Sequence, residues 1–271
     1  MGTFLAAFTT FSGLRSTRRK VVALVAGLAV LALESGPAWA DQRDDFLAGR
    51  TRECPGCDLA GGNLKRRDLT GANLAGANLK EANLHEARLT GARLAGADLT
   101  GANLNKANLA RADLVGAKLN EAMLYAANLD GAKLGGADLT EAMMGTARLT
   151  RTDLTKAVLR NVDLRKGRLA DAILLDADLN GIALDFAFLR GARFDGASLV
   201  EARLMSSELV DATLVGSDLS DADAQGANLR GANLSRAKLT GTNFRRANLY
   251  ETKLEDAVFS DTIMPDGTKQ P

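Results

Sequence analysis

A large apolar residue recurs at every fifth position from Leu59 to Phe259, and this spacing constrains the fold more than any other feature. The residue two places earlier is small, and 30 of the 41 such positions hold Ala. Repetition over most of a chain determines its architecture before local propensity does, and it leaves little sequence for a catalytic constellation. Leu fills 36 of the 41 apolar positions, and the exceptions are Met144, Phe194, Ala224, Phe244 and Phe259.

A period of five residues excludes the two common regular structures. In an α-helix each residue advances about 100°, so successive leucines would lie about 140° apart and would form no stripe. In a straight strand side chains alternate, so an odd period would send successive leucines to opposite faces. The pattern suits a chain that runs extended through Ala-x-Leu, with both side chains inward, and then turns a corner. Glycines at the corners, such as Gly71, Gly131 and Gly231, suit turns with positive φ. We therefore expect a solenoid with a narrow interior.

The tandem units, such as Ala72-Asn73-Leu74 and Ala97-Asp98-Leu99, resemble those of the pentapeptide-repeat family over residues 57–262. The resemblance implies an all-β fold, a right-handed quadrilateral parallel β-helix with four pentapeptides per coil. The 41 units would then make about ten coils, stacked at about 4.8 Å into a rod about 48 Å long.

Residues 1–40 have the organisation of a secretory signal peptide. Basic residues from Arg15 to Lys20 precede the 13-residue apolar run Val21–Leu33, and Ala38-Trp39-Ala40 forms an A-x-A cleavage site before Asp41. An uncleaved anchor is the alternative, but the run is short for a membrane span. The twin arginines leave the export route open between the general secretory and the twin-arginine pathways. We expect an exported chain, periplasmic or secreted after cleavage between Ala40 and Asp41, with no membrane span once mature.

Residues 41–56 are expected to cap the first coil, and within them residues 41–52 are expected to form a short helix or irregular lid with Phe46 and Leu47 on its apolar side. The only two cysteines, Cys54 and Cys57, follow this lid. In an oxidising compartment they would form a disulfide that pins the lid to the first coil. Two reduced thiols and a redox-active pair are the alternatives, and one C-x-x-C holds only half of a four-cysteine zinc site. No cofactor is expected.

Both ends of the repeat depart from the pattern. Arg67 occupies an inward position, so we expect an imperfect first coil, with regular stacking from Ala72. At the other end, residues 263–271 form a tail, in which Met264 and Pro265 either fold over the last coil or leave it to pair with another molecule. Some members of the family dimerise through the C-terminal coil, and the resemblance therefore implies that a homodimer is one outcome.

One pair of exceptions predicts how the coils stack. Ala224 is the only inward "leucine" position with a small side chain, and Phe244 follows it 20 residues later. A small residue beside an oversized one conserves core volume. We predict that Phe244 leans into the space beside Ala224.

The outward residues offer little chemistry. The single histidine, His85, has no nucleophile beside it. Carboxylate pairs such as Asp176 and Asp178 lack the glycine-rich repeats of calcium-binding β-rolls. Outward Asp and Asn follow the repeat and are expected to make turn or ladder hydrogen bonds; they include Asn73, Asn78, Asp98, Asp113 and Asp138. We expect neither an enzyme nor a metal site.

Charge argues against nucleic-acid mimicry. Well-known pentapeptide-repeat proteins mimic DNA and bind type II topoisomerases such as gyrase, which makes this the alternative function. Residues 58–264 hold 26 basic and 27 acidic residues, a net charge of −1. The charge is distributed unevenly along the chain. Residues 151–170 hold six basic and two acidic residues, whereas residues 171–226 hold three basic and eleven acidic residues. Export would also remove the chain from the cytoplasm, and we expect no binding to nucleic acid.

Outward apolar residues predict a contact surface, because clustered exposed apolar groups mark interaction sites. A polar coil with Asp163, Arg165 and Lys166 intervenes, so the residues form either one surface or two small patches, and scattered surface residues are the alternative. We expect a structural or protein-interaction scaffold with an unknown protein partner. The candidate contact residues are Met123, Tyr125, Met143, Phe186, Phe188 and Met205.

Overall fold

In this computed structural model, the structure describes residues 21–25, 28–32 and 38–270, with side chains from Gln42. The chain divides into two compact units, Met1–Asp41 and Gln42–Pro271. In the first unit, β1 (Val21–Val25) and β2 (Leu28–Ala32) pair antiparallel. The other residues of the predicted signal peptide before Ala38 lie outside the described ones. No helix in the described part of the chain has the length and hydrophobicity needed to cross a bilayer.

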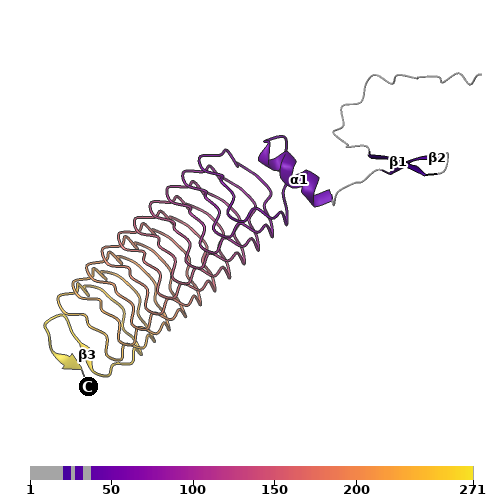
Figure 1. The fold of residues 1–271 in the computed structure, drawn as a ribbon. Helices are drawn as coiled ribbons and strands as arrows, with labels where there is room; N and C mark the ends of the chain where they lie inside the picture. Colours follow the sequence, from indigo (N-terminus) through magenta and orange to yellow (C-terminus); the bar gives the residue numbers. More distant parts are fainter. Residues whose placement is uncertain (1–20, 26–27, 33–37, 271) are drawn as a thin grey trace, which may run out of the picture. The chain divides into compact units, whose positions relative to one another are not determined.

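The second unit is a stack of 20-residue coils. Bridges join each central residue to the residue 20 places later, from Glu53↔Asn73 to Asn243↔Ile263, and all are parallel. Twenty residues are four pentapeptides, so each coil has four sides. Figure 1 shows the coils stacked from purple to yellow. Each side contributes one bridged residue, and for this reason the coils contain almost no extended strand.

Every backbone N–H of a typical unit has a partner, and this explains the repeat. The N–H of Leu74 donates to the backbone carbonyl of Arg93 in the next coil (2.7 Å), and the N–H of Asn73 donates to the backbone carbonyl of Arg52 in the preceding coil (2.8 Å). The corner N–H of Gly76 also donates to the next coil, and that of Ala77 donates to the Leu74 carbonyl within the turn (3.0 Å). One N–H per unit remains, that of the residue after Leu.

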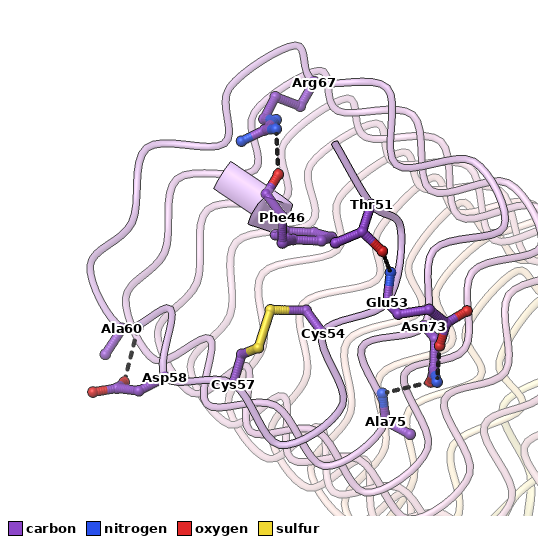
Figure 2. The surroundings of a disulfide bond; sticks show 10 residues. All are labelled: Phe46, Thr51, Glu53, Cys54, Cys57, Asp58, Ala60, Arg67, Asn73 and Ala75. Carbon is purple, nitrogen blue, oxygen red and sulfur yellow. Dashed lines mark hydrogen bonds between the residues drawn. A yellow bond between two sulfur atoms is a disulfide. The ribbon is translucent and has the colours of Figure 1, made fainter. Parts of the chain in front are cut away.

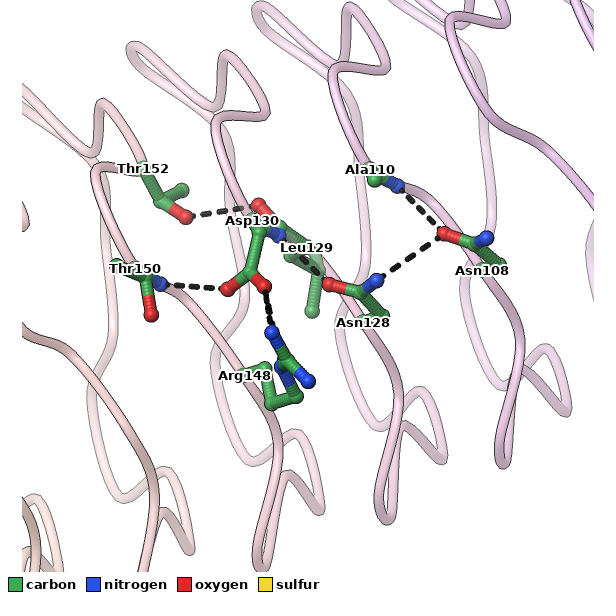
Figure 3. Close-up of polar contacts among 8 residues, drawn as sticks. All are labelled: Asn108, Ala110, Asn128, Leu129, Asp130, Arg148, Thr150 and Thr152. Atoms are coloured by element: carbon green, nitrogen blue, oxygen red, sulfur yellow. Dashed lines mark hydrogen bonds and ion pairs between the residues drawn. The ribbon is translucent and has the colours of Figure 1, made fainter.

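The Asp or Asn before Leu accepts that remaining N–H. Its side-chain oxygen accepts from the residue two places later, as in Asp138 with Thr140 (3.0 Å). The turn hydrogen bonds predicted for these outward residues are confirmed, because all five named members make them. Where another residue stands before Leu, an Asp or Asn from the preceding coil can substitute. Asp130 accepts the N–H of Thr150 in this way (2.9 Å), while its other oxygen binds Arg148 (Figure 3).

The inward Ala and Leu positions form one continuous buried core. Ala224 and Phe244 are both buried, one coil apart on the same side. Some inward positions hold Thr, and its burial is tolerated because the hydroxyl donates a hydrogen bond to a backbone carbonyl. Thr152 donates to the carbonyl of Leu129 in the preceding coil (2.8 Å; Figure 3).

The corners require a left-handed backbone. All 42 corner residues from Gly56 to Asp261 have positive φ, and 25 of them are not glycine. The sequence predicted this conformation for the glycines, and the structure extends it to every unit. Each non-glycine residue there costs about 1 kcal/mol or more, which the hydrogen bonds and the core of each coil offset.

The N-terminal cap differs in two ways from the expectation. Helix α1 (Ala38–Leu47) buries Phe46 but leaves Leu47 exposed. Regular stacking begins at Glu53 rather than Ala72, so Arg67 does not mark a faulty coil. Its guanidinium donates to the Phe46 carbonyl (2.8 Å) and lies 5.6 Å from the centre of the Phe46 ring (Figure 2). Arg67 therefore fastens the end of α1 to the first coil.

Cys54 and Cys57 form a disulfide with an S–S distance of 2.03 Å, and both are buried. The N–H of Cys54 already donates to Asn73 in the next coil (2.8 Å). Both cysteines thus belong to the first coil, and the bond closes a small ring inside it instead of pinning the lid (Figure 2).

The last coil is covered on one side only. β3 (Thr262–Ile263) continues the stack, and β4 (Lys269–Gln270) pairs antiparallel with it. On the other three sides the final bridged residues are Asn248, Lys253 and Val258, and no further coil follows them in the described chain.

Candidate interaction groove

One side of the stack carries a groove of about 610 Å³. Its apolar lining consists of Met123, Tyr125, Met143 and Phe186. Tyr125, Met143 and Phe186 are about half exposed, at 54%, 49% and 53%. Its polar lining consists of Asn105, Thr146, Asp163, Arg165 and Lys166, and Gly145 completes it.

Four of the six residues proposed from the sequence therefore line one groove. The polar coil with Asp163, Arg165 and Lys166 lines the same groove and does not divide it. Phe188 is not part of the lining; the Arg168 guanidinium lies 5.9 Å from the centre of its ring. Met205 also lies outside the lining.

A hydrogen bond with the preceding coil frees position 123 for an apolar residue. The side-chain oxygen of Asn105 accepts the N–H of Tyr125 (2.8 Å) from one coil before. Position 123 therefore needs no Asp or Asn, and Met123 can stand there. The pattern of inward and outward residues alone does not reveal this substitution; its signal in the sequence is an Asn or Asp just after Leu in one coil, followed by the absence of Asn or Asp before Leu in the next.

Gly145 leaves room for the tyrosine ring. A Cβ atom built on Gly145 would lie 3.4 Å from Cδ2 of Tyr125, so the ring packs against the glycine backbone. Gly145 is not one of the positive-φ residues. Glycine is therefore needed here because a side chain would crowd the Tyr125 ring, and not because the backbone has a conformation that favours glycine.

The charges at the groove are unequally compensated. Arg165 forms two hydrogen bonds with Asp163, from Nε to Oδ1 (2.8 Å) and from Nη2 to Oδ2 (2.7 Å). These bonds lower the pKa of Asp163 and raise that of Arg165, so both stay ionised near neutral pH. Lys166 is exposed at a corner and makes no ion pair with the residues that the structure describes. It contributes the uncompensated charge of the lining.

The other candidate chemistry stays dispersed. Nε2 of His85 lies 3.4 Å from Glu86, whose carboxylate also pairs with Arg66. Within the described residues, no three His, Cys, Asp or Glu side chains gather closely enough to hold a metal ion. Asp185 is buried beside Arg203 (2.6 Å), but its Oδ1 has no hydrogen-bond partner among the described residues.

Comparison with known proteins identifies the family. The family model for pentapeptide repeats matches in eight copies between residues 57 and 264, and the chain belongs to this family. Its members fold as right-handed quadrilateral β-helices, in agreement with the 20-residue register. The chain matches no curated protein sequence.

Two solved structures illustrate the likeness. One is HetL, a pentapeptide repeat protein involved in heterocyst differentiation regulation in the cyanobacterium Nostoc sp. strain PCC 7120. Its sequence is 32% identical to this chain, the match covers 85% of this chain and 98% of HetL, and the TM-score is 0.48. The other is a trypsin-treated form of QnrB1, a plasmid-mediated fluoroquinolone resistance protein. It is 18% identical to this chain, the match covers 74% of this chain and 88% of QnrB1, and the TM-score is 0.44.

Proposed function

We propose that this chain is an exported, non-enzymatic rod of about ten coils that acts as a protein-interaction scaffold in the periplasm. The observation that carries the proposal is the groove. Of the eight large hydrophobic residues exposed in the described chain, three line it. Exposed apolar groups gathered in a concave site are typical of a contact surface.

Phe186 adds a second argument. Among the residues that the structure describes, it is the only aromatic one at a positive-φ corner (φ 59°), where a bulky side chain is disfavoured. Backbone strain tends to be kept where a side chain has a task other than folding. A large aromatic ring held in this position, half exposed at the groove, supports a role in binding.

Export is supported by three features. The basic and apolar segments precede an A-x-A site, and the boundary between the two compact units lies one residue past the proposed cleavage after Ala40. Cys54 and Cys57 are bonded, as is common in oxidising compartments. N-terminal sequencing of the protein from cell fractions should give Asp41 first, in the periplasmic fraction. An intact N-terminus in the cytoplasm would contradict export.

Site-specific crosslinking tests the groove. We would place a photoreactive amino acid at Met143, and as a control at Val115, which is also exposed (46%) but lies two sides away around the coil. Irradiation of living cells should join a protein partner to position 143 and not to position 115. Equal yields at both positions, or none at 143, would contradict the proposal.

The open last coil supports a second proposal, a homodimer. Leu249, Leu254 and Phe259 are only partly buried there, and Tyr250 and Val258 are exposed at 63% and 55%. An uncovered coil presents unpaired strand groups to any other edge. Light scattering should show a dimer that Leu254→Lys converts to a monomer. A wild-type monomer at high micromolar concentration would contradict it.

DNA mimicry remains the alternative, because residues 171–226 carry an excess of acid. Several of those carboxylates already pair with basic residues, which weakens the likeness to a phosphate backbone: Asp178 with Arg160, Asp185 with Arg203, and Asp218 with Lys238. Inhibition of gyrase supercoiling by the purified rod at submicromolar concentration would favour this alternative over the scaffold.

A further inference from the structure

We propose that the groove binds a partner segment that carries two or more bulky apolar side chains and a carboxylate, with the carboxylate paired to Lys166. This inference rests on the proposed function, since it specifies what the groove recognises.

The backbone leaves no edge for strand addition at the groove. The N–H of Met143 donates to Ala122 (2.9 Å), that of Met144 to Asp163 (2.7 Å), and that of Thr146 to Arg165 (3.0 Å). These groups are engaged with neighbouring coils, so a partner cannot extend a sheet here. Recognition must therefore run mainly through side chains, with the N–H of Gly145 as the one backbone donor of the groove that has no acceptor among the described residues.

The shape and lining select apolar side chains. A volume of about 610 Å³ lies within the range of about 300–1,000 Å³ that is usual for ligand sites, and it exceeds what one side chain fills. Met123 and Met143 are flexible and adapt to differently shaped apolar groups. Tyr125 and Phe186 supply rigid aromatic surface, which is typical of the residues that dominate binding energy.

The charges at the groove favour a partner that carries a carboxylate. Asp163 is neutralised by Arg165, whereas Lys166 has no carboxylate partner among the described residues. Within the lining, the charged residues Asp163, Arg165 and Lys166 sum to a net charge of +1. The carboxylates at the opposite corner, Glu121 and Glu141, do not line the groove. A partner carboxylate would thus find a favourable potential and an available ammonium group.

Selection of peptides on the purified full-length protein tests the inference. A random library of 12-residue peptides would be displayed, selected on wild type, and the enriched peptides resynthesised for affinity measurement. We expect enriched sequences with two large apolar residues and at least one Asp or Glu. Enrichment of basic peptides, or of none, would overturn the inference.

Two matched pairs of variants locate the binding. Lys166→Glu should weaken it at least tenfold, whereas Lys156→Glu should change it less than twofold. Both lysines stand at exposed corners with almost the same φ (59° and 57°), so the backbone effects match. Gly145→Leu should fill the groove and abolish binding. Gly135→Leu, at the equivalent position two sides away and likewise without a positive φ, should not.

The outcomes separate the inference from the proposed function. If Lys166→Glu behaves like Lys156→Glu while Gly145→Leu still abolishes binding, the groove is used but the acidic partner is wrong. If Gly145→Leu binds as well as Gly135→Leu, the groove is not the site, and both proposals fail.

Discussion

Replacing Arg67 with alanine tests whether local contacts or the repeat pattern govern the N-terminal cap. Alanine fills 30 of the 41 positions of this kind, so the pattern predicts that Arg67→Ala is neutral or stabilising. The structure predicts the opposite, because Arg67 holds the carbonyl and the ring of Phe46.

The magnitude follows from the two contacts. A hydrogen bond from a charged donor contributes about 1.5–3 kcal/mol, and a cation–π contact at an accessible site about 0.5–1 kcal/mol. Arg67 is only half-buried, and its ordered side chain costs conformational entropy, so the lower part of the combined range applies. We expect a loss of about 2 kcal/mol, which corresponds to about 30-fold easier opening of the cap.

Hydrogen exchange measures this opening. The N–H groups of Ala48 and Gly49 donate to Asp44 and Phe46, so their exchange reports on the end of α1. In Arg67→Ala they should exchange about 30-fold faster, while amides in the middle coils are unchanged, because solenoid stability is a sum of nearest-neighbour terms. Arg66→Ala is the control, since the ion pair of Arg66 with Glu86 is exposed. Wild-type exchange at Ala48 and Gly49 in Arg67→Ala would refute the reasoning.

Three further predictions concern the coils. Thr152→Val, which keeps the shape but loses the buried hydroxyl bond to the preceding coil, should destabilise the rod by about 1 kcal/mol in chemical denaturation, and no change would contradict the bond. Burial acts to raise the pKa of Asp98, but the hydrogen bonds from Thr100 and the ion pair with Lys80 together outweigh burial and lower the pKa. The stability from this turn should therefore be present above the unfolded pKa, near 3.8, and be lost as pH falls through the lower native value, and Asp98→Asn should remove that dependence in acid titrations followed by circular dichroism. Phe244→Leu should lower the melting temperature, because it opens a cavity beside Ala224. A melting temperature equal to that of wild type would contradict the predicted packing of Phe244 against Ala224.

Much of the fold was predictable because one physical constraint repeats. The period of five excludes helix and straight strand, and the corner glycines indicated a left-handed backbone that the structure shows at all 42 corners. The Asp and Asn residues before Leu were correctly assigned to turns. The sequence could not show that Leu47 is exposed or that Arg67 reaches α1, because both depend on how the cap sits on an open coil.

The groove was only partly predictable. Sequence spacing placed Met123, Tyr125 and Met143 on one side, since side chains 20 residues apart align in this register. It did not show that Gly145 receives the Tyr125 ring or that Asp163 pairs with Arg165, and for that reason the sequence left open whether the polar coil divides the surface. Phe188 lies beyond the corner, next to Arg168, and outside the lining of the groove.

The central claim is that the groove, and not the rod as a whole, binds the partner. The most direct measurement compares partner capture and melting temperature for wild type and for the double variant Tyr125→Glu with Phe186→Glu. Both side chains are half exposed, so the account predicts loss of capture with an unchanged melting temperature. Capture equal to that of wild type by a fully folded double variant would contradict it.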